Sequence, residues 1–127
     1  NEVFRHVKKF RFCMLDPVYQ TDLNRSIYDW YVEQLLNRYV LMPSGEVTKQ
    51  DRGNPSGQIS TTMDNNMVNT FLQAFEFAYV HPELSLDELD VLYSQTDSLI
   101  YGDDRLSSWP VIPEDYVARV VGMYEHI

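Results

Sequence analysis

Residues 98–108 read Ser-Leu-Ile-Tyr-Gly-Asp-Asp-Arg-Leu-Ser-Ser. The runs 98–101 and 105–108 suit short strands, and the turn residues between them are typical of a β-hairpin. Asp103 and Asp104 therefore stand at the tip of the expected hairpin. Two neighbouring carboxylates there offer oxygen ligands to hard divalent cations, which phosphoryl-transfer enzymes use to clamp the attacking and leaving oxygens. The alternative for the same residues is a plain solvated turn stabilised by an aspartate side chain.

A second polar signature, Gly53-Asn54-Pro55-Ser56-Gly57, precedes a long helix that we expect over residues 60–80. Glycines around a serine let the backbone approach a nucleotide closely, and the first turn of a helix directs free amides toward anions. A tight turn in which Ser56 or Ser60 caps the helix is the alternative. The first half of the helix contains residues that are poor choices for a helix interior and that indicate hydrogen-bonding work: Thr61, Thr62, Asp64, Asn65, Asn66 and Asn69.

The rest of the pattern predicts an α+β fold in one domain, residues 1–127. A helix is expected over 2–12, with Val3, Phe4, Val7 and Phe10 on its apolar side and Arg5, Lys8, Lys9 and Arg11 on the other. After Asp16-Pro17, caps among Thr21, Asp22 and Asn24 predict a helix of about 15 residues that carries Ile27, Trp30, Tyr31, Leu35 and Leu36. A hairpin with strands 39–42 and 46–49 follows. Ser85 to Glu88 match a capping box, and a last helix, 114–127, would turn Tyr116, Val117, Val120, Val121 and Tyr124 inward.

Composition favours a globular, reduced protein. Of the 127 residues, 44% are hydrophobic, which is enough for a packed core. The net charge of -9 argues against a surface that binds nucleic acid by charge alone, so such a role must use metal ions or basic parts outside this chain. The single cysteine, Cys13, has apolar neighbours that suit a buried thiol in the cytoplasm. No window approaches the roughly 18 apolar residues of a membrane span.

The two polar signatures together resemble a known family. The spacing of Ser56-Gly57, Thr61 and Asn65, followed by Tyr101-Gly102-Asp103-Asp104, is similar to motifs B and C in the palm of viral RNA-dependent RNA polymerases. The fuller string over residues 53–67 is most similar to the polymerase of astroviruses, which are positive-strand RNA viruses. The likeness runs through essentially the whole chain. It implies that residues 1–127 are a palm fragment, an α+β structure whose small antiparallel sheet contains the Gly-Asp-Asp hairpin and packs on helices.

The resemblance implies roles for the residues at the hairpin tip. Asp103 would be a principal ligand of catalytic magnesium, for which manganese can substitute, and Asp104 would be a less direct ligand. Gly102 would supply the turn, and Tyr101 would pack the strand that supports it. The parent enzyme would attach the α-phosphorus of a nucleoside triphosphate to the 3′ oxygen of an RNA strand, on an RNA template.

The resemblance also assigns the first signature. Ser56 and Gly57 would form the flexible loop that touches the template and the incoming nucleotide. Thr61 and Asn65 would lie near the ribose, where an amide can recognise the 2′ hydroxyl that separates RNA precursors from DNA precursors. Implied partners are the template and primer or product RNA, nucleoside triphosphates, and the remaining fingers, palm and thumb of the same polymerase.

Some parts of the family pattern are not found in the chain. Motif A has two aspartates separated by four residues, but Asp16 and Asp22 have a different spacing and are interpreted as a helix stop and a cap. Motif D has a lysine that acts as a proton donor, and no lysine follows Lys49. We therefore expect a piece of a longer protein that is inactive alone. Its expected setting is a replication complex in the host cell cytoplasm, with any membrane association made through other proteins.

Two other functions fit parts of the pattern. A non-catalytic acidic interaction module, with Asp103 and Asp104 in a surface turn or a weak calcium site, would explain the charge but not the spacing of Ser56, Thr61 and Asn65. A reverse transcriptase would share the metal chemistry. Its aspartate pair usually sits in a different tetrapeptide, and the same three residues favour RNA precursors.

Overall fold

The computed structural model describes residues 1–126 and divides into two compact units, residues 1–65 and the part that begins at Asn66. The fold class is α+β, as expected, with five α-helices and two antiparallel sheets in the described part of the chain. Each sheet has only two strands: β1 (Arg38–Leu41) pairs with β2 (Val47–Gln50), and β3 (Asp97–Tyr101) pairs with β4 (Asp104–Ser108). Both expected hairpins are thus present, each as a two-stranded sheet of its own, and β3 with β4 forms the one that carries the Gly-Asp-Asp turn. None of the helices within residues 1–126 is long and apolar enough to cross a membrane.

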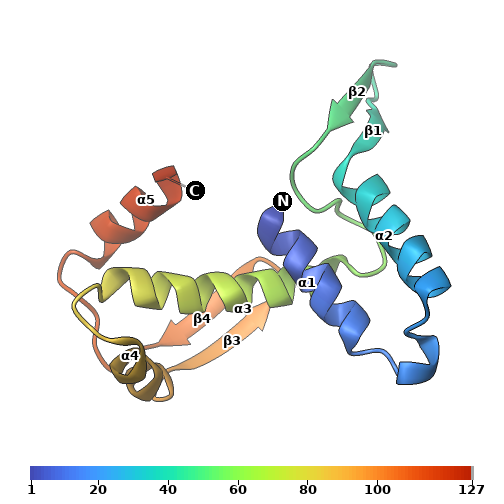
Figure 1. Cartoon of the computed structure of the whole chain (residues 1–127). Helices are drawn as coiled ribbons and strands as arrows, with labels where there is room; N and C mark the ends of the chain where they lie inside the picture. Colours follow the sequence, from blue (N-terminus) through green and yellow to red (C-terminus); the bar gives the residue numbers. More distant parts are fainter. Residues whose placement is uncertain (127) are drawn as a thin grey trace. The chain divides into compact units, whose positions relative to one another are not determined.

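The first unit begins with two helices and a hairpin (Figure 1). Its elements are α1 (Glu2–Cys13), the 3-10 turn η1 (Pro17–Tyr19), α2 (Asp22–Leu36), β1 (Arg38–Leu41) and β2 (Val47–Gln50). Helices α1 and α2 contact each other and bury the apolar core of the unit: Phe4, Val7, Phe12, Val32, Leu35 and Leu36. The unit ends with a loop and the first turn of α3 (Thr61–Val80).

Capping residues set the boundaries between α1 and α2. The Asp16 side chain accepts a hydrogen bond from the Val18 amide at 3.0 Å, and Pro17 occupies the first position of η1, where a missing N–H costs nothing. The Thr21 hydroxyl accepts from the Asn24 amide at 3.2 Å and caps α2. Asp16 thus lies in the turn after α1, as expected, whereas Asp22 is the first residue of α2 and the cap is Thr21 rather than Asp22.

The second unit contains most of α3, followed by α4 (Leu86–Tyr93), β3 (Asp97–Tyr101), β4 (Asp104–Ser108) and α5 (Tyr116–His126). The β3–β4 hairpin lies alongside α3 (Figure 1). The core is built around Phe77, whose ring lies 5.3 Å from that of Tyr93 and 5.0 Å from that of Trp109. The capping box of Ser85 and Glu88 is present at the start of α4 and confirms the prediction there.

The helices lie close to where the periodicity predicted them, although α5 begins at Tyr116 rather than at residue 114 and residue 127 of that prediction lies outside the described residues. Several buried faces differ from the prediction. In α2, Leu35 and Leu36 are buried as expected, but Trp30 is 65% exposed and Ile27 is exposed as well, and Val32 is buried in their place. In α5, Val117 and Val121 are exposed and Met123 is buried. The apolar positions of both helices allow two stripes about one residue apart, and the pattern alone does not distinguish them.

The burial of two side chains of α1, Cys13 and Lys8, also differs from the prediction. Cys13 is exposed rather than buried, since it follows Phe12 and lies about 100° farther around the helix. Lys8, which the sequence placed on the solvated side, is only 2% exposed. It lies at i+4 from Phe4 and i−4 from Phe12, both of which are buried, so it belongs to the same stripe.

Candidate functional site

Ser56 and Gly57 lie on the loop between β2 and α3, and both are exposed. Gly57 has a φ of 85°, a region that residues with a Cβ rarely adopt. No atom lies within 4 Å of the place where its Cβ would stand. The backbone conformation, rather than crowding, is therefore what requires glycine at this position.

Thr61 and Asn65 close this loop from the first turn of α3. The Thr61 hydroxyl lies 2.7 Å from the Pro55 carbonyl and 2.9 Å from the Gln58 carbonyl, so its proton is used within the loop. The Asn54 side chain donates from Nδ2 to Oδ1 of Asn65 at 2.9 Å. Asn65 Nδ2 has no hydrogen-bond partner within residues 1–126. Of these two predicted ribose contacts, Asn65 keeps a free donor and Thr61 has a role in shaping the loop.

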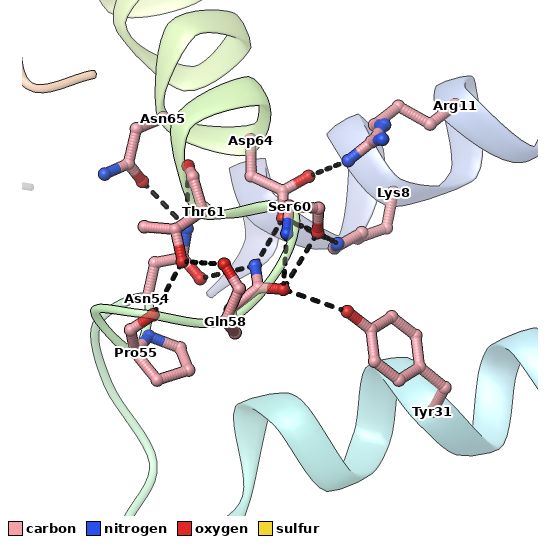
Figure 2. A network of polar contacts seen from close by, with 10 residues as sticks. All are labelled: Lys8, Arg11, Tyr31, Asn54, Pro55, Gln58, Ser60, Thr61, Asp64 and Asn65. Carbon is pink, nitrogen blue, oxygen red and sulfur yellow. Dashed lines mark hydrogen bonds and ion pairs between the residues drawn. The ribbon is translucent and has the colours of Figure 1, made fainter.

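A buried carboxylate, Asp64, anchors the same loop (Figure 2). Asp64 is fully buried, and its Oδ2 lies 2.6 Å from Lys8 Nζ while its Oδ1 lies 2.5 Å from an Arg11 guanidinium nitrogen. Oδ2 also accepts hydrogen bonds from Ser60 Oγ at 2.9 Å and Gln58 Nε2 at 3.0 Å. Two cations from α1 therefore hold the end of the loop and the start of α3 together.

These contacts determine the ionisation of Asp64. Burial alone would raise the pKa of this carboxyl group. The hydrogen bonds from Lys8, Arg11 and Ser60 outweigh burial and lower the pKa below its usual value. Asp64 is thus an ionised, acceptor-only group at neutral pH.

Sequence reasoning missed this anchor, although it had a detectable signal. Lys8 continues the stripe of Phe4 and Phe12 at helical spacing, and a lysine in such a stripe needs a buried partner. Its ammonium nitrogen also lies 5.3 Å from the centroid of the Phe4 ring and 5.2 Å from that of Tyr31, distances typical of cation–π contacts. The sequence predicted hydrogen bonds for Asp64 but gave it no ionic partner.

In the second unit, α3 holds the backbone of the hairpin turn that carries the paired aspartates. Asn66 Oδ1 accepts a hydrogen bond from the Gly102 amide at 2.5 Å. Asn69 Nδ2 approaches three turn carbonyls, and the nearest, that of Asp103, is 3.1 Å away. The prediction that these asparagines make hydrogen bonds is confirmed, and the contacts leave the carboxylates of the turn unused.

The hairpin turn consists of Gly102 and Asp103, because Tyr101 pairs with Asp104. Gly102 is buried and has a φ of 65°, which is the arrangement of a type II′ turn with glycine first. It supplies the turn, as expected. Tyr101, expected to pack its strand, is instead 75% exposed.

Asp103 and Asp104 are both exposed, and neither carboxylate has a hydrogen-bond or ion-pair partner in the described part of the chain. Unengaged carboxylate oxygens suit magnesium, which proteins hold with one or two carboxylates together with substrate phosphates and water. No group of three or more histidine, cysteine or acidic residues that could hold a metal occurs within residues 1–126. The two aspartates therefore fit a magnesium site to which other ligands contribute.

A second buried carboxylate, Glu76, fixes the strand that follows this turn. Arg105 and the Tyr116 hydroxyl both bond to the fully buried Glu76 side chain, so β4 and α5 are tied to α3. Burial, and next the hydrogen bond to the Glu76 carboxylate, raise the pKa of Tyr116 to about 12. Arg105 directly follows Asp104, so this cluster restrains the backbone next to the aspartate pair.

The profile of the family described as viral RNA-dependent RNA polymerase matches residues 1–127. The chain therefore belongs to the viral RNA-dependent RNA polymerase family. This match favours the polymerase over an acidic interaction module.

Among curated proteins, the chain is similar to the non-structural polyprotein 1AB of several astroviruses. It is 61% identical to that of ovine astrovirus 1 over 100% of this chain and 9% of the polyprotein. The identity is 52% to that of human astrovirus 1, over 98% of this chain and 8% of the polyprotein, and 38% to that of turkey astrovirus 2, with the same coverage. The chain thus spans less than a tenth of the length of these relatives. No solved structure matches it.

Proposed function

We propose that the polymerase containing this chain is an RNA-directed RNA polymerase that uses Asp103 and Asp104 as ligands for magnesium. The observation that carries the proposal is the pair of exposed, unengaged carboxylates on a turn whose backbone is held by Asn66 and Asn69. When bound, magnesium would supply the positive charge that stabilises transfer of a nucleotide from its triphosphate to an RNA 3′ oxygen. Manganese can fill the same oxygen site.

The residues of this chain position the metal-binding carboxylates and recognise the template and the nucleotide. Gly102 and the asparagines of α3 fix the turn, so that the carboxylates are oriented before substrate arrives. Ser56 and Gly57 form an exposed loop that contacts the template and the incoming nucleotide. Asn65 offers its free amide nitrogen to the ribose, while Thr61 keeps the loop closed.

The setting that we propose is a viral replication complex in the host cell cytoplasm, with the rest of the polymerase, RNA and nucleoside triphosphates as partners.

Nucleotide addition by the intact polymerase tests the proposal. Asp103→Asn should abolish addition of nucleotides to an RNA primer, because an amide is a poor magnesium ligand, and should leave the circular dichroism spectrum unchanged. Asp97→Asn is the matched control, since Asp97 is an exposed aspartate at the other end of β3. Ordinary turnover by the Asp103→Asn enzyme would refute the assignment of Asp103 as a magnesium ligand.

A further inference from the structure

In the polar network around the loop before α3, each side-chain amide has one orientation, so that its donor and acceptor atoms are fixed. Asp64 determines these orientations. The carboxylate is ionised between Lys8 and Arg11, so it can only accept hydrogen bonds. A neighbouring amide side chain must therefore present its nitrogen to it. That neighbour is Gln58, whose Nε2 lies 3.0 Å from Asp64 Oδ2 (Figure 2).

The other end of Gln58 agrees with this orientation. Its Oε1 accepts from the backbone amide of Ser60 at 2.9 Å, and a backbone N–H can only donate. Two partners of fixed character, a carboxylate and a backbone amide, thus set which atom of Gln58 is nitrogen and which is oxygen. Assignments of amide orientation rest on this kind of network.

The orientation of the Gln58 amide determines that of the Asn54 amide. Its Nε2 lies 3.3 Å from Asn54 Oδ1, so the Asn54 oxygen is the acceptor there. Asn54 Nδ2 then donates to the Thr61 carbonyl at 3.3 Å, which can only accept, and to Asn65 Oδ1 at 2.9 Å. The oxygen of Asn65 is consequently occupied, and its nitrogen is the group left to bind something else.

We infer that Asn54 is a specificity-determining positioning residue: by holding Oδ1 of Asn65, it presents Asn65 Nδ2 as a hydrogen-bond donor to the 2′ position of the incoming nucleotide. This inference rests on the proposed function. A donor at this place favours a 2′ substituent that can accept a hydrogen bond. A 2′-fluorine can only accept, and a 2′-deoxy carbon can do neither, so the two analogues report the direction of the Asn65 amide.

The experiment compares kcat/KM of the intact polymerase for a 2′-fluoro and a 2′-deoxy nucleoside triphosphate. In Asn54→Asp, the new carboxylate can only accept, so it draws in Asn65 Nδ2 and turns Oδ1 outward toward the 2′ position. An oxygen facing fluorine is unfavourable. We expect the 2′-fluoro to 2′-deoxy ratio to fall about tenfold relative to the unmodified enzyme, the equivalent of about one hydrogen bond.

Three further variants isolate the effect. Asn24→Asp is the matched control, because Asn24 is also half-buried and donates from Nδ2, at 2.8 Å to the Tyr19 carbonyl, and this change should leave the ratio unaltered. Asn54→Ala frees Asn65 to present either atom and should lower the ratio by a smaller factor, which supplies a result if Asn54→Asp does not fold. In an Asn65→Ala background, Asn54→Asp should no longer change the ratio.

The outcomes separate this inference from the function on which it rests. An unmodified enzyme that adds no nucleotide to RNA would refute the proposed polymerase. A working enzyme in which both Asn54 variants keep the unmodified ratio would overturn the role of Asn54. An equal fall in kcat/KM for both analogues would also overturn it, because loss of structure alone does not distinguish fluorine from hydrogen.

Discussion

Lys8 is one of two cations that bond to the fully buried carboxylate of Asp64, with its Nζ 2.6 Å from Oδ2. Removing one partner of a buried ion pair leaves a charge without compensation, which costs about 3–5 kcal/mol. Because Arg11 stays in place, we expect Lys8→Met to lower the opening free energy of the loop by about 3 kcal/mol, the low end of that range. Hydrogen exchange of the amides of residues 53–65 in the polymerase measures this change.

Lys9 offers the control for that substitution. It is the next residue of α1 and is exposed, so Lys9→Met should change the same amides by less than about 0.5 kcal/mol. Replacing both charged partners, Lys8→Met with Asp64→Leu, should recover much of the loss, because no buried charge then remains unpaired. Equal effects of Lys8→Met and Lys9→Met would contradict the burial of the pair.

The lowered pKa of Asp64 makes the loop sensitive to acid. Since the folded protein holds this carboxyl ionised more strongly than the unfolded chain does, its stabilisation is present above the ordinary aspartate pKa and is lost as pH falls through the lower folded value. Protection of the loop amides should therefore fall on acidification below about pH 4. In Asp64→Asn this particular acid dependence should be absent, and an identical pH profile in the two proteins would refute its origin.

At the scale of the secondary-structure elements, the β3–β4 turn depends on a glycine for its conformation rather than for space. Gly102 has a positive φ, and nothing lies within 4 Å of the place of its Cβ. Gly102→Ala should therefore destabilise the hairpin by about 1–3 kcal/mol through backbone strain. Hydrogen exchange of the β3 and β4 amides in the polymerase measures the loss.

Gly122 is the matched glycine. It lies inside α5, has no positive φ, and a Cβ there would also meet nothing within 4 Å. Gly122→Ala should stabilise α5 by about 0.5–1 kcal/mol, since alanine loses less entropy in a helix. The two substitutions should thus change stability in opposite directions. A loss of stability in both would contradict the role of the positive φ at Gly102.

Local patterns predicted the elements well, because helix periodicity, caps and turn residues act between near neighbours. Ser85 with Glu88 and Thr21 with Asn24 lie within one turn of each other, and both caps are present. The buried face of a helix depends instead on which other element covers it. For that reason Met123, rather than Val117, proved to be the buried residue of α5.

The residues of the candidate site also fall into those that the sequence predicts and those that only the fold brings together. Ser56, Gly57, Asp103 and Asp104 follow from motif spacing, because their residue types are tied to one kind of chemistry. The anchor pair of Lys8 and Asp64 links residues far apart in sequence, and only the fold brings them together. The direction of the amides of Gln58 and Asn54 depends in turn on that pair, so no local pattern could show it.

At the scale of the whole molecule, one face of the β3–β4 hairpin remains uncovered. Leu99 and Leu106 pair across the two strands and, with Tyr101, are 73%, 71% and 75% exposed in that order. Because burying a leucine is worth about 1.5–3 kcal/mol, we expect other parts of the polymerase to cover this face. Leu106→Lys should then lower the melting temperature of the intact polymerase.

Ser107→Lys is the control for that prediction, because Ser107 is the exposed neighbour of Leu106 and points to the opposite face of the strand. It should have a smaller effect on the melting temperature. If Leu106→Lys leaves the polymerase as stable as Ser107→Lys does, the apolar face of the hairpin stays exposed to solvent in the larger protein.

The central claim is that Asp103 holds a catalytic metal ion, and an exchange of ligand and metal tests it most directly. Asp103→Cys replaces a hard oxygen ligand with a soft thiolate, which binds magnesium poorly and cadmium well. We predict that the variant polymerase adds no nucleotide with magnesium alone and regains activity when cadmium is added, whereas cadmium does not increase the activity of the unmodified enzyme. Full activity of Asp103→Cys with magnesium alone would contradict the claim.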